Sequence, residues 1–217
     1  MVSMDNYEKE RKKMVKDQLL KRGITDENVI RVMRTVERHC FVDEEKRHKA
    51  YHDSPVATDC SQTISQPYMV ALMTQLLDLT GEEKVLEIGT GTGYQTAILA
   101  ELSRFVFSIE RHSRLAENAR SLLGKMDYHN VNIRVGDGTL GLAEEAPFDA
   151  ILVTAGAPSV PHEFIEQLLD YGRLVIPVGS AFQQELRLVL KRGDSYIEKA
   201  VCGCVFVPLI GAKGWDK

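Results

Sequence analysis

The residues with the clearest chemical meaning form a glycine-rich turn near the middle of the chain. The segment VLEIGTGTGYQTAILA, residues 85–100, passes from a short apolar run through Gly89, Gly91 and Gly93 into a helical pattern. Glycine lacks a Cβ, so these positions allow a tight turn and let a ligand lie against the free N–H groups at the start of the helix. The segment predicts a nucleotide or nucleoside site, with a purely structural turn as the alternative.

Two carboxylates follow predicted strands further along the chain. Glu110 lies 19 residues after Gly91, near the acidic position that binds a ribose diol in dinucleotide-binding folds. Asp137 lies between two glycines after the next strand, where its carboxylate could meet an adenine amino group. A surface glutamate and an ordinary polar turn are the competing interpretations of these two residues.

The spacing of the glycines distinguishes two classes of cofactor. NAD-binding turns have the pattern GxGxxG, whereas this chain has GxGxG preceded by Glu87. A dinucleotide needs its third glycine one residue later and a helix N-terminus aimed at pyrophosphate. S-adenosylmethionine has no phosphate, and an acidic residue such as Glu87 can accommodate its ammonium group. We therefore predict a methyltransferase rather than a dehydrogenase, and a non-catalytic cofactor-binding module stays open.

Length, composition and charge restrict the remaining possibilities. A chain of 217 residues, 44% hydrophobic and 27% charged, is typical of one soluble globular domain. The formal charge of -4 argues against nucleic acid as the main partner. The uncharged stretch 201–212 is too short to span a membrane, and the start MVSMDNYEKERKK lacks the apolar core of a secretory signal. We expect a cytoplasmic enzyme without a membrane or nucleic-acid partner.

Cysteine and histidine residues do not form a metal-binding pattern. The four cysteines have spacings unlike a zinc module or a CxxC pair: Cys40, Cys60, Cys202 and Cys204. On a strand, the last two would share one face, which favours a core or interface position. His48 and His52 have helical i, i+4 spacing but no third ligand nearby. We predict structural thiols and no metal site.

Strand and helix patterns alternate around the glycine turn. Strands are predicted over residues 84–88, 105–109, 131–135, 149–153 and 173–178, and helices over 67–77, 97–102, 113–126 (capped by Ser113) and 161–170. This alternation predicts parallel strands joined by right-handed crossovers. The alternating run 185–191, the turn 192–194 and the extended run 196–207 predict an antiparallel hairpin at the end of the sheet.

The residues before this alternating region read as polar helices. The charge run KERKKMVK, residues 9–16, predicts a solvated helix face. A second helix begins after Gly23, with Thr25 as its cap, and carries a buried stripe of apolar residues: Val29, Val32, Met33 and Val36. We predict a single domain, 1–217, with residues 1–66 as a helical extension and substrate-side loop and residues 67–217 as the cofactor-binding core.

With these motifs, the sequence resembles the protein-L-isoaspartate (D-aspartate) O-methyltransferase family, a class I family that depends on S-adenosylmethionine. The resemblance covers roughly residues 10–211. It rests on QTISQPYMVALM (62–73), VLEIGTGTGYQTAILA (85–100), SIER (108–111), GDGTLG (136–141), PFDAILVTAGAP (147–158), GRLVIPVG (172–179) and FVPL (206–209). Many methyltransferases share the glycine motif, so the specificity for this family comes mainly from QTISQPYM and TAGAP.

The resemblance implies a fold and a reaction. The fold is α/β, a Rossmann-like sheet that is mostly parallel with an antiparallel C-terminal hairpin, helices on both faces and an N-terminal helical extension. The reaction is methyl transfer to the free carboxyl group of L-isoaspartyl, and less readily D-aspartyl, residues in damaged proteins, which begins their repair through a succinimide. A methyltransferase acting on a small molecule or RNA is the alternative, and a monomer is favoured.

The family pattern also assigns residues. It places the active-site serine at Ser65, the ribose contact at Glu110 and the adenine contacts at Asp137 and Gly138. The full set expected to bind S-adenosyl-L-methionine or its product S-adenosyl-L-homocysteine is Thr63, Ile64, Glu87, Gly89, Thr90, Gly91, Gly93, Glu110, Asp137 and Gly138. Many relatives have glycine just before QTIS, whereas this chain has TDCS at 58–61, so we expect a differently shaped substrate-side loop.

Ser65 is expected to act by position. The substrate carboxylate is ionised near neutral pH and can attack the sulfonium methyl group without a general base. Ser65 would then donate a hydrogen bond that holds the carboxylate in line. The alternative role for Ser65 is a cap for the helix that begins at Pro67, although Gln66 could cap that helix instead.

Overall fold

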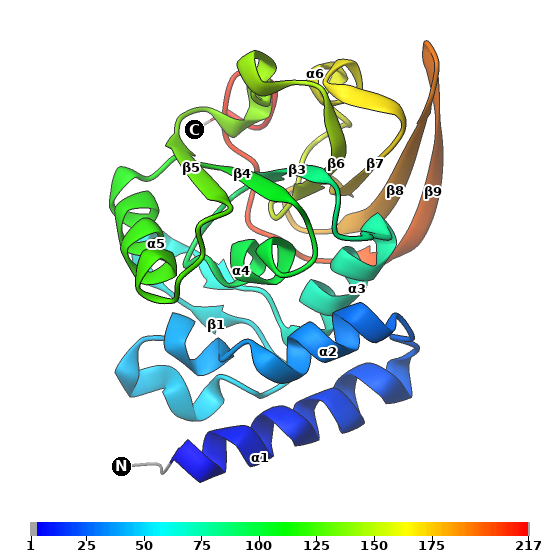
Figure 1. Cartoon of the computed structure of the whole chain (residues 1–217). Coiled ribbons are helices and arrows are strands. Elements are labelled where there is room, and N and C mark those ends of the chain that lie inside the picture. The colour runs from blue at the N-terminus through cyan, green and yellow to red at the C-terminus, as the bar shows by residue number, and fades with distance from the viewer. Residues whose placement is uncertain (1–3, 217) are drawn as a thin grey trace.

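The computed structural model of the protein has a seven-stranded sheet at its centre (Figure 1). The structure describes residues 4–216, and for Met4, Asp5 and Ser61 it describes the backbone alone. The strand order is β5-β4-β3-β6-β7-β8-β9. The strands are β3 (Lys84–Ile88), β4 (Phe105–Glu110), β5 (Val131–Val135), β6 (Phe148–Val153), β7 (Leu168–Gly179), β8 (Gln184–Arg192) and β9 (Ser195–Cys204). Strands β3 to β7 pair in parallel with one another, β8 pairs antiparallel with β7, and β8 and β9 form an antiparallel hairpin at one edge. The predicted α/β fold is confirmed.

Helices cover both faces of this sheet. They are α1 (Met4–Met14), α2 (Glu27–Thr35), α3 (Pro67–Leu77), α4 (Tyr94–Ala100), α5 (Ser113–Lys125) and α6 (His162–Glu166). Because side chains alternate along a strand, Val85 faces a cluster shared with α1 to α5, whereas Leu86 faces a second cluster on the side of α6. Each face therefore has its own hydrophobic core, and the carboxyl ends of β3, β4 and β6 meet at one edge of the sheet.

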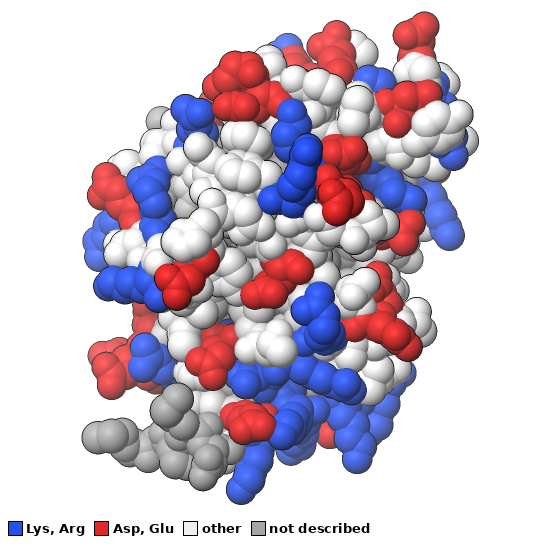
Figure 2. Space-filling view, in the orientation of Figure 1, with Lys and Arg blue, Asp and Glu red and all other residues white. Residues whose placement is uncertain are grey.

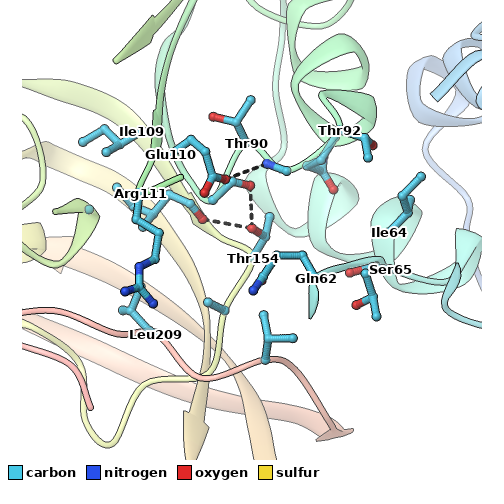
Figure 3. A pocket seen from close by; sticks show the side chains of 18 of the residues that line it. Gln62, Ile64, Ser65, Thr90, Thr92, Ile109, Glu110, Arg111, Thr154 and Leu209 are labelled. Atoms are coloured by element: carbon cyan, nitrogen blue, oxygen red, sulfur yellow. Dashed lines mark hydrogen bonds between the residues drawn. The ribbon is translucent and has the colours of Figure 1, made fainter. Parts of the chain in front are cut away.

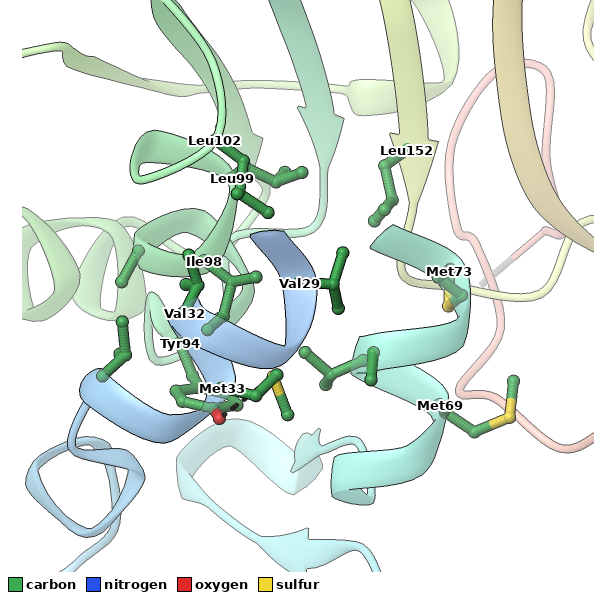
Figure 4. Close-up of a cluster of buried hydrophobic side chains, with 14 of the residues drawn as sticks. Val29, Val32, Met33, Met69, Met73, Tyr94, Ile98, Leu99, Leu102 and Leu152 are labelled. Carbon is green, nitrogen blue, oxygen red and sulfur yellow. Dashed lines mark hydrogen bonds between the residues drawn. The ribbon is translucent and has the colours of Figure 1, made fainter. Parts of the chain in front are cut away.

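The N-terminal helices belong to the larger of these two clusters. Val32 and Met33 of α2 are fully buried and pack with α3, α4 and Leu152 of β6 (Figure 4). Burying one such side chain contributes roughly 1.5–3 kcal/mol. The buried stripe predicted for this helix is confirmed. The N-terminal extension and the sheet thus share one continuous core.

Short elements connect these helices to the sheet. The two-stranded hairpin of β1 (Val56–Ala57) and β2 (Thr63–Ile64) leads into α3. The remaining turns of helix are η1 (Val15–Leu19), η2 (Leu20–Arg22), η3 (Arg38–Phe41), η4 (Glu44–Lys49), η5 (Asp59–Ser61), η6 (Gly138–Leu140) and η7 (Ala143–Glu145). At the hairpin tip, Thr58 N–H donates to the Gln62 carbonyl over 2.8 Å, and Cys60 has a left-handed φ of 57°.

Some predicted boundaries are wrong. Asp26, not Thr25, caps α2, because its carboxylate reaches the N–H groups of Asn28 and Val29. His112, not Ser113, is the N-cap residue of α5, and it makes no side-chain cap bond. Strand β7 begins at Leu168 because that residue pairs with Phe148, so the preceding helix is shorter than predicted. Strand β9 ends at Cys204, and the chain then returns across the sheet edge.

The surface shows an uneven distribution of charge. Lys and Arg gather over the lower part of the face in Figure 2, where Figure 1 has α1 and α2. The predicted solvated face is confirmed for the exposed lysines of the charge run: Lys9, Lys12, Lys13 and Lys16. Arg11 is the exception, since it is buried and its Nε donates to the Arg34 carbonyl over 2.7 Å.

Within residues 4–216, no helix is both long and apolar enough to cross a membrane. Residues 1–3, on which part of the expectation about a secretory signal rests, lie outside the described residues. All four cysteines are free thiols, and those at 40, 202 and 204 are partly buried.

Candidate active site

A cavity opens at the edge where the parallel strands end (Figure 3). Its walls come from the chain before α3, the glycine turn, the end of β4, the end of β6 and the C-terminal tail. The residues that line it include Gln62, Thr63, Ile64, Ser65, Ile88, Gly89, Thr90, Gly91, Thr92, Ile109, Glu110, Arg111, Gly138, Thr154, Leu209 and Ile210. Ligands of open α/β sheets bind at this edge. Eight of the eleven predicted site residues, Ser65 among them, lie on this wall.

The glycine turn has the backbone that its sequence predicts. Gly89, Gly91 and Gly93 have φ values of 98°, 55° and 91°, a region that residues with a Cβ rarely adopt. The first two line the cavity. Gly93 instead forms the N-cap of α4, where a Cβ would lie 3.3 Å from Cδ1 of Leu123. The prediction that Gly93 contacts the cofactor is therefore corrected, because the glycine lets α4 approach α5.

Glu110 links the turn to the end of β4. Its Oε2 accepts a hydrogen bond from Gly91 N–H over 2.9 Å, and its Oε1 accepts one from His112 N–H over 3.0 Å. The side chain is buried but reaches the cavity wall. A carboxylate oxygen has two lone pairs, so each oxygen of Glu110 keeps one for a ligand. This arrangement suits a pair of neighbouring hydroxyl groups.

Glu87 lies beneath the turn rather than on the cavity wall. Its carboxyl group is fully buried and accepts hydrogen bonds from the hydroxyl groups of Thr96, over 2.6 Å, and Ser108. Burial raises the pKa of Glu87 to about 8, against the hydrogen bonds that act to lower it. The carboxyl group is then mostly protonated at neutral pH. Its predicted contact with a cofactor ammonium is corrected, since the side chain supports the turn from below.

Only one of the two residues predicted at the adenine end reaches the cavity wall. Gly138 lines the cavity, and a Cβ there would lie 2.6 Å from Cγ2 of Ile88. The Asp137 carboxylate accepts bonds from Thr139 N–H and from Ala212 N–H, over 2.9 and 2.8 Å. It thereby ties the C-terminal tail to the sheet edge. The predicted contact of Asp137 with adenine stays a prediction beside this internal tie.

Ser65 borders two cavities. A second cavity lies against the first, and its lining includes Pro55, Gln66, Met69 and the end of β9. Residues common to both linings are Thr63, Ser65, Thr154 and Val207. Within the described part of the chain, the Ser65 hydroxyl has no protein hydrogen-bond partner, and Gln66 is the N-cap residue of α3. The alternative that Ser65 caps this helix is therefore wrong, and its hydroxyl is available to a ligand.

Several wall residues were not predicted from the sequence. Gln62 and Thr154 belong to the segments QTIS and TAGAP, so the family resemblance contained a signal for them. Arg111 belongs to the segment SIER, which carried the same kind of signal. Leu209 and Ile210 reach the cavity because the C-terminal tail folds back, with Ile210 bridged to Trp215. Hydrophobic periodicity does not encode such a return.

One group of possible metal ligands occurs among the described residues, in the N-terminal extension. The ligand atoms of Glu37, His39 and Cys40 lie within 4.8 Å of one another. Glu37 also pairs with Arg11 over 3.4 Å, and His39 Nδ1 lies 2.8 Å from the Tyr51 hydroxyl. Burial lowers the pKa of His39. These side chains already have partners within the protein, and a nearby guanidinium opposes a cation.

Fold and site together define the class of protein. The mostly parallel sheet with an antiparallel end, the glycine turn and its acidic partner are those of a class I methyltransferase that uses S-adenosyl-L-methionine. A solved protein-L-isoaspartate O-methyltransferase superposes with a TM-score of 0.84 at 27% identity, covering 94% of this chain and 67% of that one. A putative protein-L-isoaspartate O-methyltransferase from Plasmodium falciparum, in complex with S-adenosyl-L-homocysteine, gives 0.79 at 25% identity, covering 94% and 98%.

Sequence comparison identifies the family. The family model described as protein-L-isoaspartate(D-aspartate) O-methyltransferase (PCMT) matches residues 9–214. Protein-L-isoaspartate O-methyltransferase 1 of Syntrophobacter fumaroxidans is 53% identical over 213 residues, 98% of this chain and 100% of the relative. The corresponding enzyme of Geobacter metallireducens is 54% identical over 211 residues, 97% and 98%. The chain belongs to the protein-L-isoaspartate (D-aspartate) O-methyltransferase family, as its motifs predicted.

Proposed function

We propose that the protein transfers a methyl group from S-adenosyl-L-methionine to the free carboxyl group of L-isoaspartyl residues, and less readily of D-aspartyl residues, in damaged proteins. The names of its relatives support this substrate class. The observation that carries the proposal is the meeting of two cavities at Ser65, which lines both. One cavity suits a cofactor and the other a peptide side chain.

The cofactor is assigned to the cavity at the glycine turn. The residues proposed to contact it are Thr63, Ile64, Gly89, Thr90, Gly91, Glu110 and Gly138. Glu110 supports the fit because each carboxylate oxygen keeps a lone pair for a ribose hydroxyl. The missing side chain at Gly138 supports it as well, because it leaves flat backbone beside the apolar Ile88 and Ile109, where an adenine ring can lie.

The reaction needs position more than acid or base groups. S-adenosyl-L-methionine supplies a methyl group bonded to a positively charged sulfur. The substrate carboxylate oxygen forms the new bond to the methyl carbon as the carbon–sulfur bond breaks, and the electron pair of that bond stays on sulfur. The products are a methyl ester and S-adenosyl-L-homocysteine, and no proton has to be removed. Ser65 holds the carboxylate by donating its hydroxyl hydrogen, so that the three reacting atoms lie in line.

The deciding experiment measures transfer of radiolabelled methyl groups to matched isoaspartyl and aspartyl peptides. A small carboxylic acid and an RNA oligonucleotide are included as acceptors, because a methyltransferase acting on a small molecule or RNA is the alternative. We expect base-labile label on the isoaspartyl peptide and little on its aspartyl partner. Equal labelling of the two peptides, or labelling of RNA alone, would refute the proposal.

We also propose that the chain acts as a monomer in the cytoplasm, as one domain over residues 1–217. The free thiols support a reducing compartment. The core that α2 shares with β6 supports one folding unit rather than two. In this division, residues 1–66 shape the substrate side and residues 67–217 hold the cofactor. Light scattering at micromolar concentration tests the monomer, and a single unfolding transition in urea tests the single domain.

A further inference from the structure

Thr154 occupies the boundary between the two cavities. It directly follows β6, the strand beside β3, and its side chain lines both cavities, as that of Ser65 does. Figure 3 shows it between the glycine turn and the segment that contains Ser65. The roles assigned to the glycine turn, Glu110 and Ser65 leave this residue without a function.

The hydroxyl hydrogen of Thr154 has two acceptors within reach, and the Gly89 carbonyl oxygen is the nearer one. Thr154 Oγ1 lies 2.7 Å from the Gly89 carbonyl oxygen and 3.0 Å from the Ile88 carbonyl oxygen. The Ile88 oxygen already accepts the backbone N–H of Thr154 over 2.9 Å. Since a hydroxyl has one hydrogen, the shorter contact to Gly89 is the one it makes.

Gly89 and Thr154 also fit each other sterically. A Cβ on Gly89 would lie 2.2 Å from Thr154 Oγ1, so the hydroxyl fills the space that a side chain would need. On its other side, Gly89 N–H donates to the Ile109 carbonyl over 2.8 Å. The peptide groups on both sides of this glycine are thus anchored, one to β4 and one to Thr154.

We propose that Thr154 is a positioning residue for methyl transfer. Its hydroxyl fixes the Gly89 carbonyl, which borders the cofactor cavity, and so sets where the methyl donor lies relative to the carboxylate held at Ser65. A rotated Gly89 peptide would shift the donor, and in-line transfer is sensitive to displacements on the order of 1 Å. That the methyl group moves from a donor in the first cavity to a carboxylate in the second rests on the proposed function.

Two substitutions separate the hydroxyl group from the shape of the side chain. Thr154→Val keeps the shape and removes the hydrogen bond, whereas Thr154→Ser keeps the hydroxyl and removes a methyl group. Thr35→Val is the matched control, because that hydroxyl donates to carbonyl groups within α2, far from the cavity wall. Single-turnover methyl transfer to an isoaspartyl peptide is measured with the KM for the peptide and the affinity for S-adenosyl-L-homocysteine by calorimetry.

We expect Thr154→Val to lower the single-turnover rate at least tenfold while the peptide KM changes less than threefold. Thr154→Ser and Thr35→Val should stay within threefold of the parent. Equal single-turnover rates for the valine and serine variants would overturn the proposal, whether both rates match the parent or both are reduced. If thermal unfolding shows that Thr154→Val does not fold, Thr154→Ala is compared with Thr154→Ser on the same criteria.

The outcomes distinguish this inference from the proposed function. A parent protein that labels no isoaspartyl peptide contradicts the function itself, and calorimetry then still reports whether Thr154 affects the cofactor cavity. A parent that labels the peptide, together with a valine variant of equal rate, contradicts the role of Thr154 alone.

Discussion

Ser65 lines both cavities, and its hydroxyl has no protein partner among residues 4–216, so the hydroxyl hydrogen is free for the substrate carboxylate. A hydrogen bond to a charged group contributes about 1.5–3 kcal/mol. We therefore expect Ser65→Ala to lower kcat roughly ten- to a hundredfold with little change in cofactor affinity. Steady-state kinetics with an isoaspartyl peptide and calorimetry with S-adenosyl-L-homocysteine measure the two effects. Ser113→Ala, an exposed change, is the control, and an unchanged kcat in Ser65→Ala would contradict the assignment.

Glu110 combines two tasks that one substitution can disturb together. Both of its oxygens accept backbone N–H groups, so Glu110→Gln places an amide donor against Gly91 N–H or His112 N–H. It also removes acceptor capacity for the ribose hydroxyls. We expect the affinity for S-adenosyl-L-homocysteine, measured by calorimetry, to fall at least tenfold. Glu117→Gln, an exposed change on α5, should leave it unaltered. Equal affinity of parent and Glu110→Gln would remove the ribose assignment.

The sequence motifs identified the wall of the site better than they identified what each residue does. Gly89, Gly91 and Glu110 were predictable because spacing between a strand and a helix determines their place. Glu87 was assigned to the cofactor from its charge, but strand alternation turns it away from the side of Ile88 and towards α4. Asp137 is used by the returning tail, a contact between residues 75 positions apart that no local pattern reveals.

At the scale of elements, the hairpin tip before α3 is connected to α5 across the glycine turn. Asp59 Oδ2 lies 3.1 Å from Arg114 Nη2, and Gly91 and Thr92 line the space beside them. This ion pair lies in the segment where relatives were expected to have glycine. We call this ion pair the strap, because it joins the hairpin tip to α5 beside Gly91 and Thr92, which also line the cofactor cavity.

Arg114→Ala removes the strap without touching the cavity wall. The two side chains are 73% and 45% exposed, and exposed pairs contribute about 0.2–1 kcal/mol. We expect S-adenosyl-L-homocysteine to dissociate about two- to fivefold faster, as measured by stopped-flow fluorescence. The difference should vanish at high salt, where the pair is screened in the parent as well. Arg104→Ala is the exposed control, and identical dissociation rates at low salt would rule out the strap.

The order of the elements could be predicted from the sequence, whereas several of their ends could not. Thr25 and Asp26 have equivalent capping chemistry, and only the path of the chain decides which side chain reaches the N–H groups of α2. The early start of β7 depends on pairing with Phe148, which lies 20 positions before Leu168. Alternation of strand and helix reports topology, and tertiary contacts set the boundaries.

At the scale of the whole molecule, one core joins the N-terminal extension to the sheet, and Glu87 is an ionisable group buried within that structure. Burial raises the pKa of Glu87 from 4.5 to about 8. Between these pH values, the unfolded chain has lost the proton and the folded protein retains it. The unfolded state then binds fewer protons, so the free energy of unfolding decreases as pH rises through this window and levels off above it. Each pKa unit corresponds to about 1.4 kcal/mol.

Glu87→Gln keeps the size of this side chain and an acceptor for Thr96 and Ser108 but cannot ionise. Between pH 5 and pH 8, we expect the free energy of unfolding to decrease in both proteins, but less in Glu87→Gln. The two decreases should differ by at least about 1 kcal/mol, which is close to the effect of a single pKa unit. Urea unfolding of both proteins across this range measures the difference, with the exposed Glu144→Gln as control. Parallel pH profiles for Glu87→Gln and parent would mean that Glu87 ionises in the folded protein as readily as in the unfolded chain, and the glycine turn would then rest on a charged carboxylate.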